Sequence, residues 1–190
     1  MIADEFYKNI VILGSGGTGI TAALKLSRLF KNHYNVKINL IGNNFNIRNQ
    51  LSLKLFSQNL KELNANRRLK KNLEYHIDNV KKIDLKNRRV YFGEKVIHFR
   101  FIVVDLTNRN YYELLKKSIT EAGNAKQIIV DDYLREPDMP FVYLIGDNAI
   151  MKPDTGLLIS AVNSVTLKQE RFAAQNIYNE VYGYEMEMPA

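Results

Sequence analysis

A glycine cluster at residues 14–19 follows directly on a short apolar run and precedes a segment of helical periodicity. The run before it, NIVIL at 9–13, has no polar alternation, which is typical of a parallel strand buried on both faces. Apolar residues then recur at helical spacing over 20–30, and VKINLI at 36–41 predicts a second strand. A strand, tight loop, helix and strand within the first 42 residues predict an α/β fold with a doubly wound, Rossmann-like parallel sheet.

The cluster fits the pattern G-x-G-x-x-G in the context that gives this pattern meaning. In that pattern Gly14 permits a tight turn, Gly16 leaves room for a pyrophosphate, and Gly19 lets the helix pack closely on the sheet. The helix N-terminus carries about half a positive charge, which stabilises an anion. The expected pyrophosphate-binding residues are Gly14, Ser15, Gly16, Gly17, Thr18 and Gly19. The alternative is a glycine-rich turn without a ligand.

The end of the second strand departs from the dinucleotide-binding pattern. An acidic side chain that binds ribose is expected there, and this chain has Gly42. Asn43 and Asn44 can hydrogen-bond to ribose without a charge. Arg48 indicates an alternative, recognition of the 2′-phosphate of NADPH.

The remaining chain predicts further elements of one domain, 1–190. Periodicity predicts an amphipathic helix at 47–63, and alternation over 80–99 predicts a small antiparallel β-meander with turns at 86–88 and 93–94. A buried strand at 101–107, a helix at 111–122, a strand at 128–131 and a long helix at 160–182 complete the prediction.

A second candidate site lies in VYLIGDNA, where a buried strand ends in Gly146 and Asp147. Ligands of open α/β sheets lie outside the carboxyl ends of the strands, so Asp147 is expected on the same rim as the glycine loop. Both ends of one elongated dinucleotide would then be bound. The alternative is that Asp147 is only a turn or cap residue.

The segment IIVDDYLREPDMPFVYLIGDNA resembles the second FAD-binding motif of the pyridine nucleotide-disulfide oxidoreductase-like flavoproteins. The likeness is greatest to type II NADH dehydrogenases and sulfide:quinone reductases, in which I-x-V-D-x-x-L-R precedes a strand that ends in G-D. The final helix, 164–177, also resembles their A-x-Q-G-x-x-A-x-N-I. The resemblance implies an adenine contact at Val80, a ribityl contact at Asp147, and backbone amides near Ser164, Val165 and Thr166 at the flavin pyrimidine.

The chain also departs from that family. The NADH-binding domain of the family falls where this chain has only 108–126, and the chain stops soon after its last helix. Asp105, Leu106 and Thr107 stand where the family has a form like V-V-A-T-G-S. Residues 1–107 and 124–190 thus resemble the two halves of an FAD domain alone, roughly half of such an enzyme.

The function expected from the resemblance is a noncovalent FAD-binding flavoprotein with a redox or electron-transfer role. No side chain stands out as an acid, base or nucleophile, and an FAD-dependent oxidoreductase activity is left open. A homodimer or a redox partner protein is expected to cover the exposed flavin. The alternative is a nonenzymatic dinucleotide-binding module, or an NADPH-binding protein, without redox activity.

Composition excludes several other classes. The chain has no cysteine, so disulfides and iron–sulfur clusters are ruled out, and three scattered histidines indicate no metal site. No secretion signal or membrane-spanning run is evident, which predicts a cytoplasmic protein.

The net charge of +7 is concentrated in Arg67, Arg68, Lys70, Lys71, Lys81, Lys82, Arg88 and Arg89. This basic middle segment is expected to be a solvated face, or to contact anionic lipid at the membrane periphery or an acidic partner; no nucleic-acid motif accompanies it.

Overall fold

A computed structural model describes residues 9–14, 16–33, 35–42, 72–119, 128–146, 149–151, 159–160 and 169–187. Its main feature is a six-stranded sheet in the order β3-β2-β1-β7-β10-β9. The strands are β1 (Asn9–Leu13), β2 (Lys37–Gly42), β3 (Leu73–Ile77), β7 (Phe101–Asp105), β9 (Arg135–Glu136) and β10 (Met139–Ile145). All neighbouring pairs are parallel except β10 with β9. The predicted α/β fold with a doubly wound parallel sheet is confirmed.

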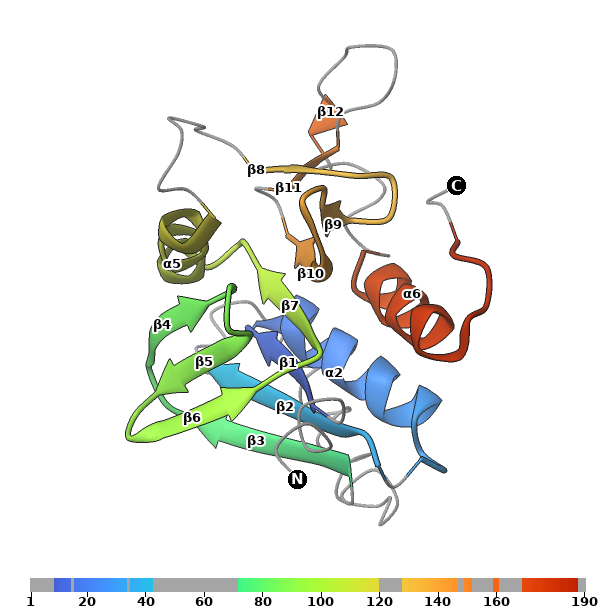
Figure 1. Ribbon diagram of the computed structural model, residues 1–190, viewed down its shortest axis with the longest axis horizontal. Coiled ribbons are helices and arrows are strands. Elements are labelled where there is room, and N and C mark those ends of the chain that lie inside the picture. Colours follow the sequence, from blue (N-terminus) through green and yellow to red (C-terminus); the bar gives the residue numbers. More distant parts are fainter. Residues whose placement is uncertain are drawn as a thin grey trace.

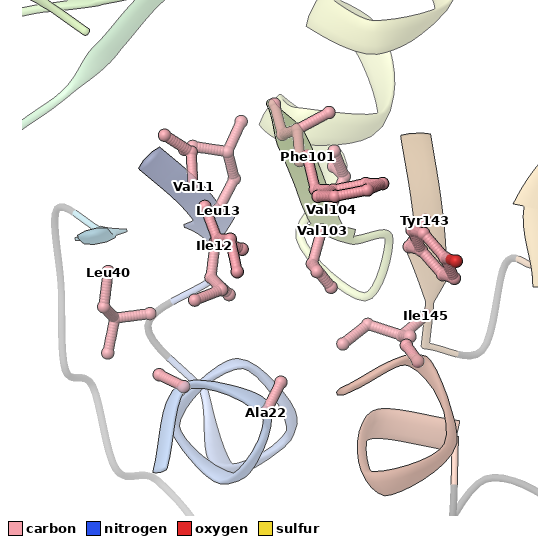
Figure 2. Close-up of a cluster of buried hydrophobic side chains, with 14 of the residues drawn as sticks. Val11, Ile12, Leu13, Ala22, Leu40, Phe101, Val103, Val104, Tyr143 and Ile145 are labelled. Carbon is pink, nitrogen blue, oxygen red and sulfur yellow. The ribbon is translucent and has the colours of Figure 1, made fainter. Parts of the chain in front are cut away.

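Helices cover the two faces of this sheet (Figure 1). Helix α2 (Gly17–Leu29) packs against α6 (Gln169–Tyr182) on one face, and α5 (Arg109–Ile119) lies on the other. Figure 2 shows Ile12 and Val103 on the side of the sheet that faces α2, with Ala22 of the helix projecting toward them. Because both faces are covered, all five residues of β7 are buried, as the unbroken apolar runs predicted.

The antiparallel meander is also confirmed. It consists of β4 (Val80–Asp84), β5 (Arg89–Phe92) and β6 (Lys95–His98), and it packs next to α5 (Figure 1). The first turn is closed by Asp84, whose carboxylate accepts a hydrogen bond from the Asn87 backbone N–H at 3.0 Å. Turn chemistry and period-2 alternation together made this region predictable.

Several expectations need correction. Strand β3 was not predicted, and the predicted helix at 47–63 lies outside the described residues. The long helix was predicted to begin at residue 160, but Ser160 belongs to β12 (Ile159–Ser160), which pairs with β11 (Ala149–Met151). The predicted strand at 128–131 is confirmed as β8 (Ile128–Val130), which pairs with β11 in a separate three-stranded sheet.

Helix α6 is held to the sheet and to the chain that follows it. The Tyr143 hydroxyl on β10 donates a hydrogen bond to Glu180 Oε2 at 3.1 Å. Asn176 and Glu187 exchange two hydrogen bonds, from Asn176 Nδ2 to the Glu187 carbonyl at 3.0 Å and from the Glu187 N–H to Asn176 Oδ1 at 2.8 Å. Asn179 Nδ2 donates to the Glu185 carbonyl at 2.8 Å. Residues 184–187 therefore lie against α6.

Candidate functional site

The candidate site is the rim formed by the carboxyl ends of β1, β7 and β10. Leu13 pairs with Val104, and Asp105 pairs with Ile145, so the three strands end at the same level. Gly14 follows β1, Asp105 closes β7, and Gly146 follows β10. Gly14 and Gly146 therefore lie on the same rim, whereas Asp147, which the sequence predicts there, lies outside the described residues.

Close packing explains two of the loop glycines. A Cβ on Gly19 would lie 2.6 Å from the Gly14 carbonyl oxygen, and a Cβ on Gly14 would lie 2.8 Å from Asp105 Cβ. Both distances are shorter than real Cβ contacts, so larger residues would force the backbone apart. These glycines allow α2 to begin immediately beside the end of β1.

Gly16 has a different environment. It is the N-cap of α2, with an extended backbone (φ −86°, ψ 179°) and no side-chain cap hydrogen bond. Among the described residues, a Cβ placed there would meet only Asp105 Oδ2, at 3.7 Å. No acidic residue occupies the first turn of α2. Gly16 is therefore an exposed residue at the positive, N-terminal end of α2.

Asp105 is the central side chain of the rim. It is 3% exposed, and its Oδ1 accepts a hydrogen bond from the Thr107 backbone N–H at 3.1 Å. Its Oδ2 lies 3.2 Å from the Cβ position of Gly14, and its Oδ1 lies 2.8 Å from that of Gly146. The carboxylate thus lies between the two loops. The sequence analysis treats Asp105 only as a departure from the family. Its position at the end of a buried run of residues could have indicated that it lies on the rim.

Two side chains at the start of α6 complete the rim. The Gly146 N–H donates to Gln169 Oε1 at 2.8 Å, while Gln169 Nε2 is buried without a hydrogen-bond partner among the described residues. Glu170 is 7% exposed. Burial raises the pKa of Glu170, its own backbone N–H and the Arg171 charge lower it, and the negative charge of Asp105 raises it further.

The other predicted site residues are only partly placed. Gly17 and Thr18 form the first turn of α2, and Val80 begins β4 as a half-buried residue paired with Phe92. Gly42 ends β2, where its carbonyl accepts a hydrogen bond from the Asp78 N–H at 3.2 Å. The residues that lie outside the described part of the chain are Ser15, Asn43, Asn44, Arg48, Asp147, Ser164, Val165 and Thr166.

The I-x-V-D-x-x-L-R segment forms a closed loop near this rim. Asp131 accepts hydrogen bonds from the backbone N–H groups of Tyr133 and Arg135 at 2.9 and 2.8 Å. Its Oδ2 also pairs with Arg135 Nε at 2.8 Å. The aspartate and arginine of the motif therefore stabilise each other, and Leu134 between them has a left-handed φ of 64°. Within the described residues this motif has a structural role.

The basic middle segment is described only from Lys81 onward. Lys81 and Lys82 are exposed on β4, and Lys81 Nζ pairs with Glu94 at 3.0 Å. A cavity of about 720 Å³ between β4 and α5 is lined by several lysines, including Lys86 and Lys117. It is formed by residues other than those of the strand-end rim. No described helix has both the length and the apolar character that a membrane crossing requires.

Comparisons with known proteins support the fold. No protein-family model matches the sequence, and no curated protein matches it either. The structure is similar to that of Fdr9, with a TM-score of 0.56 at 9% identity over 90% of this chain and 74% of that chain. It is also similar to a putative thioredoxin reductase, TrxB from Bacillus anthracis, with a TM-score of 0.56 at 11% identity over 93% and 99% of the two chains.

A sulfide:quinone oxidoreductase from Aquifex aeolicus matches less well, with a TM-score of 0.37 at 19% identity. That match covers 70% of this chain and 37% of the oxidoreductase. The arrangement of sheet, helices and meander, together with the matches to Fdr9 and TrxB, shows that this chain shares the fold of these two proteins.

Proposed function

We propose that this chain binds FAD noncovalently along the strand-end rim, with the FAD pyrophosphate at the glycine loop. The observation that carries the proposal is the environment of Gly16, an extended helix start without a side-chain cap, where an added Cβ would meet no described atom closer than Asp105 Oδ2 at 3.7 Å. A pyrophosphate needs that combination of backbone access and positive helix end. The similarity of the fold to that of a putative thioredoxin reductase supports FAD over other dinucleotides.

The residues proposed for each part of FAD follow the order of the chain. Gly14, Ser15, Gly16, Gly17, Thr18 and Gly19 would bind the pyrophosphate; Asn43, Asn44 and Val80 the adenosine; and Gly146, Asp147, Ser164, Val165 and Thr166 the ribityl chain and flavin. The unpartnered Gln169 Nε2 supports a polar ligand next to Gly146, because a buried N–H group without an acceptor is unfavourable. A ligand oxygen would satisfy it.

Redox chemistry in such a protein would be supplied by the flavin, while the chain binds it and sets its environment. We propose a role as an FAD-dependent electron carrier of the type II NADH dehydrogenase kind. Between β7 and β8 the described residues form one helix, α5, where that family has its NADH-binding domain. A second copy of the chain or a redox partner would therefore cover the flavin, and the exposed lysines of β4 are suited to an acidic partner or an anionic membrane surface.

The test is the absorption spectrum of the purified chain and its titration with FAD. A yellow protein, or a colourless one that takes up FAD stoichiometrically, supports the proposal, whereas a chain that binds no FAD overturns it. Gly16→Ala should fold normally, because the nearest described atom to its Cβ is an ordinary contact at 3.7 Å. It should weaken FAD binding about tenfold by crowding the pyrophosphate.

The matched control is Gly183→Ala, at a position with nothing within 4 Å of the added Cβ. This variant should lose some stability because φ at Gly183 is +71°, but its affinity for FAD should not change. Equal effects of the two variants on FAD affinity would show that the Gly16 effect is not local.

A second candidate is a dinucleotide-binding module without redox use. The observation that favours it is the Asp105 carboxylate beside Gly14 and Gly16, together with Gly42 in place of an acidic ribose ligand. Calorimetry with FAD, ADP, NADH and NADPH separates the candidates, because a module of this kind would bind ADP-like ligands without a flavin preference. An NADPH-binding protein would instead lose NADPH selectively, relative to NADH, in Arg48→Ala.

A further inference from the structure

We propose that the cavity between β4 and α5 is a binding site for a small molecule that has an apolar body and an anionic group. The cavity is formed by residues other than those of the strand-end rim, so the inference goes beyond the proposed function and does not depend on it. The volume of the cavity, its apolar wall and the charge of its lining support the proposal.

The cavity has the size of a small-molecule site. Its volume is about 720 Å³, and its described lining comes from the segments 81–86 and 114–119. These segments belong to β4 with the turn after it and to α5, which pack next to each other (Figure 1). Sites for small molecules commonly enclose about 300–1,000 Å³. A membrane surface or a folded partner would contact the edge of such a cavity without filling it, so a small molecule is favoured.

The two sides of the cavity are held together, and part of its wall is apolar. The Leu85 backbone N–H donates a hydrogen bond to Ser118 Oγ at 3.3 Å. Ile83 and Leu85 are buried in the hydrophobic core, and Leu114 and Ile119 of α5 are half-buried and pack against that core. Covering these side chains with an apolar body removes apolar surface from water, which favours binding.

Lysines accompany this apolar wall. The four that line the cavity are all exposed, and they are Lys81, Lys82, Lys86 and Lys117. Lys81 pairs with Glu94 at 3.0 Å, whereas Lys86 and Lys117 form no ion pair within the described residues. One lysine from each side of the cavity is therefore available to an anionic group.

Asp84 is the one acidic residue of the described lining, and it is engaged in its own turn. Its carboxylate accepts hydrogen bonds from the Asn87 backbone N–H and from Asn87 Nδ2, each at 3.0 Å. With four lysines and this aspartate, the described lining has a net positive charge. A carboxylate, phosphate or sulfonate group is therefore attracted to the cavity.

The experiment uses three probes that separate the two parts of the proposed ligand. Octanoate has an apolar chain and a charge, octanol has the chain alone, and inorganic phosphate has the charge alone. In calorimetric titrations of the full chain, octanoate should bind at least about tenfold more tightly than either of the others, because it alone uses both the apolar wall and the lysines. Amide chemical shifts locate the bound octanoate, and they should change in the segments 81–86 and 114–119 rather than at the rim glycines.

Variants test the two parts of the cavity separately. The double variant Lys86→Gln with Lys117→Gln changes exposed side chains and should weaken octanoate binding about fivefold, while octanol binding stays unchanged. Leu114→Gln should weaken both octanoate and octanol about threefold. The matched control is Lys31→Gln with Lys95→Gln, which removes the same charge at exposed positions outside the described lining. Its affinity for octanoate should stay within about twofold of wild type.

The inference is overturned if octanoate binds no more tightly than octanol, if its shifts fall at the rim, or if the double variant and its control behave alike. Adsorption to anionic vesicles that is lost in the double variant, without octanoate binding, overturns it too and assigns these lysines to a membrane surface. Titration with FAD separates this result from the proposed function. A chain that binds octanoate in the cavity and refuses FAD retains the inference and loses the function, and a chain that binds FAD alone does the reverse.

Discussion

Asp105 is the last residue of β7 and Asp131 directly follows β8, but their carboxylates have different surroundings. Asp131 is held by residues of its own loop, where the Arg135 guanidinium lies 2.8 Å away and two backbone N–H groups donate to it. Asp105 faces other segments, with Gly14 and Gly16 on one side and Gly146 on the other. The first carboxylate organises one loop. The second lies where three strand ends meet.

The difference in surroundings gives the two aspartates, Asp105 and Asp131, different structural roles. A carboxylate paired within its loop lowers the free energy of that loop and presents little charge outward. The Asp105 carboxylate instead lies between segments that follow different strands, so a change there affects more than one segment. The comparison can be tested by measuring the free energy of unfolding of variants at and around Asp131 and Asp105.

The largest effect is expected for Asp131→Ala. It removes an ion pair and two hydrogen bonds to backbone N–H groups, and should lower the free energy of unfolding by about 2–3 kcal/mol. Urea denaturation measures this loss. Asp132→Ala, at the exposed neighbouring position, is the control and should stay within about 0.5 kcal/mol of wild type. Asp105→Ala should cost less than Asp131→Ala; the opposite order would contradict the comparison.

A smaller effect is expected for Gly146→Ala, about 2 kcal/mol in the free energy of unfolding. Gly146 has a φ of +100°, and its added Cβ would lie 2.6 Å from Thr107 Oγ1 and 2.8 Å from Asp105 Oδ1. Gly183→Ala has the positive φ without the contacts and should cost about 1 kcal/mol. In the Asp105→Ala background the cost at Gly146 should fall. An unchanged cost would mean that Asp105 does not limit the space there.

The smallest effect concerns Glu170. Because burial raises its pKa in the folded state, the folded chain binds this proton more tightly than the unfolded chain does. This group therefore favours folding below its unfolded pKa, and the contribution is lost as the pH rises through the folded value.

Glu170→Gln should accordingly be more stable than wild type at pH 7, by under about 1 kcal/mol, with the difference shrinking as the pH falls. Thermal denaturation of both proteins between pH 7 and pH 5 measures it. Repeating the series with Asp105→Asn should reduce the difference, since one cause of the raised pKa is then removed. A difference that grows on acidification would contradict this assignment.

Much of the fold could be predicted because local patterns determine it. The strands β1, β2 and β7 are rich in Ile, Leu and Val, and the strands of the meander alternate apolar and polar residues, with turn residues between them. Strand β3 was missed because Glu74 and His76 interrupt its apolar character at the edge of the sheet. The strands β9 and β12, of two residues each, are too short to produce a period.

The candidate site was predictable only in part. The spacing of Gly14, Gly16 and Gly19 identifies the loop, because the local backbone of such a loop requires glycine at each of these positions. The role of Asp105 depends on the register that sets Leu13 beside Val104 and Ile145 beside Asp105. Register between strands so far apart in the chain is a tertiary property, and no local pattern of residues contains it.

The hydrogen bonds between Asn176 and Glu187 affect more of the molecule than the C-terminal segment that they hold. They hold residues 184–187 along the C-terminal half of α6, a helix of 14 residues and thus about 21 Å long. Gln169 and Glu170 begin the same helix, so contacts that fix its C-terminal half also contribute to fixing the element that carries them. The positions of Gln169 and Glu170 at the rim therefore depend in part on hydrogen bonds of Asn176 that lie far from the rim.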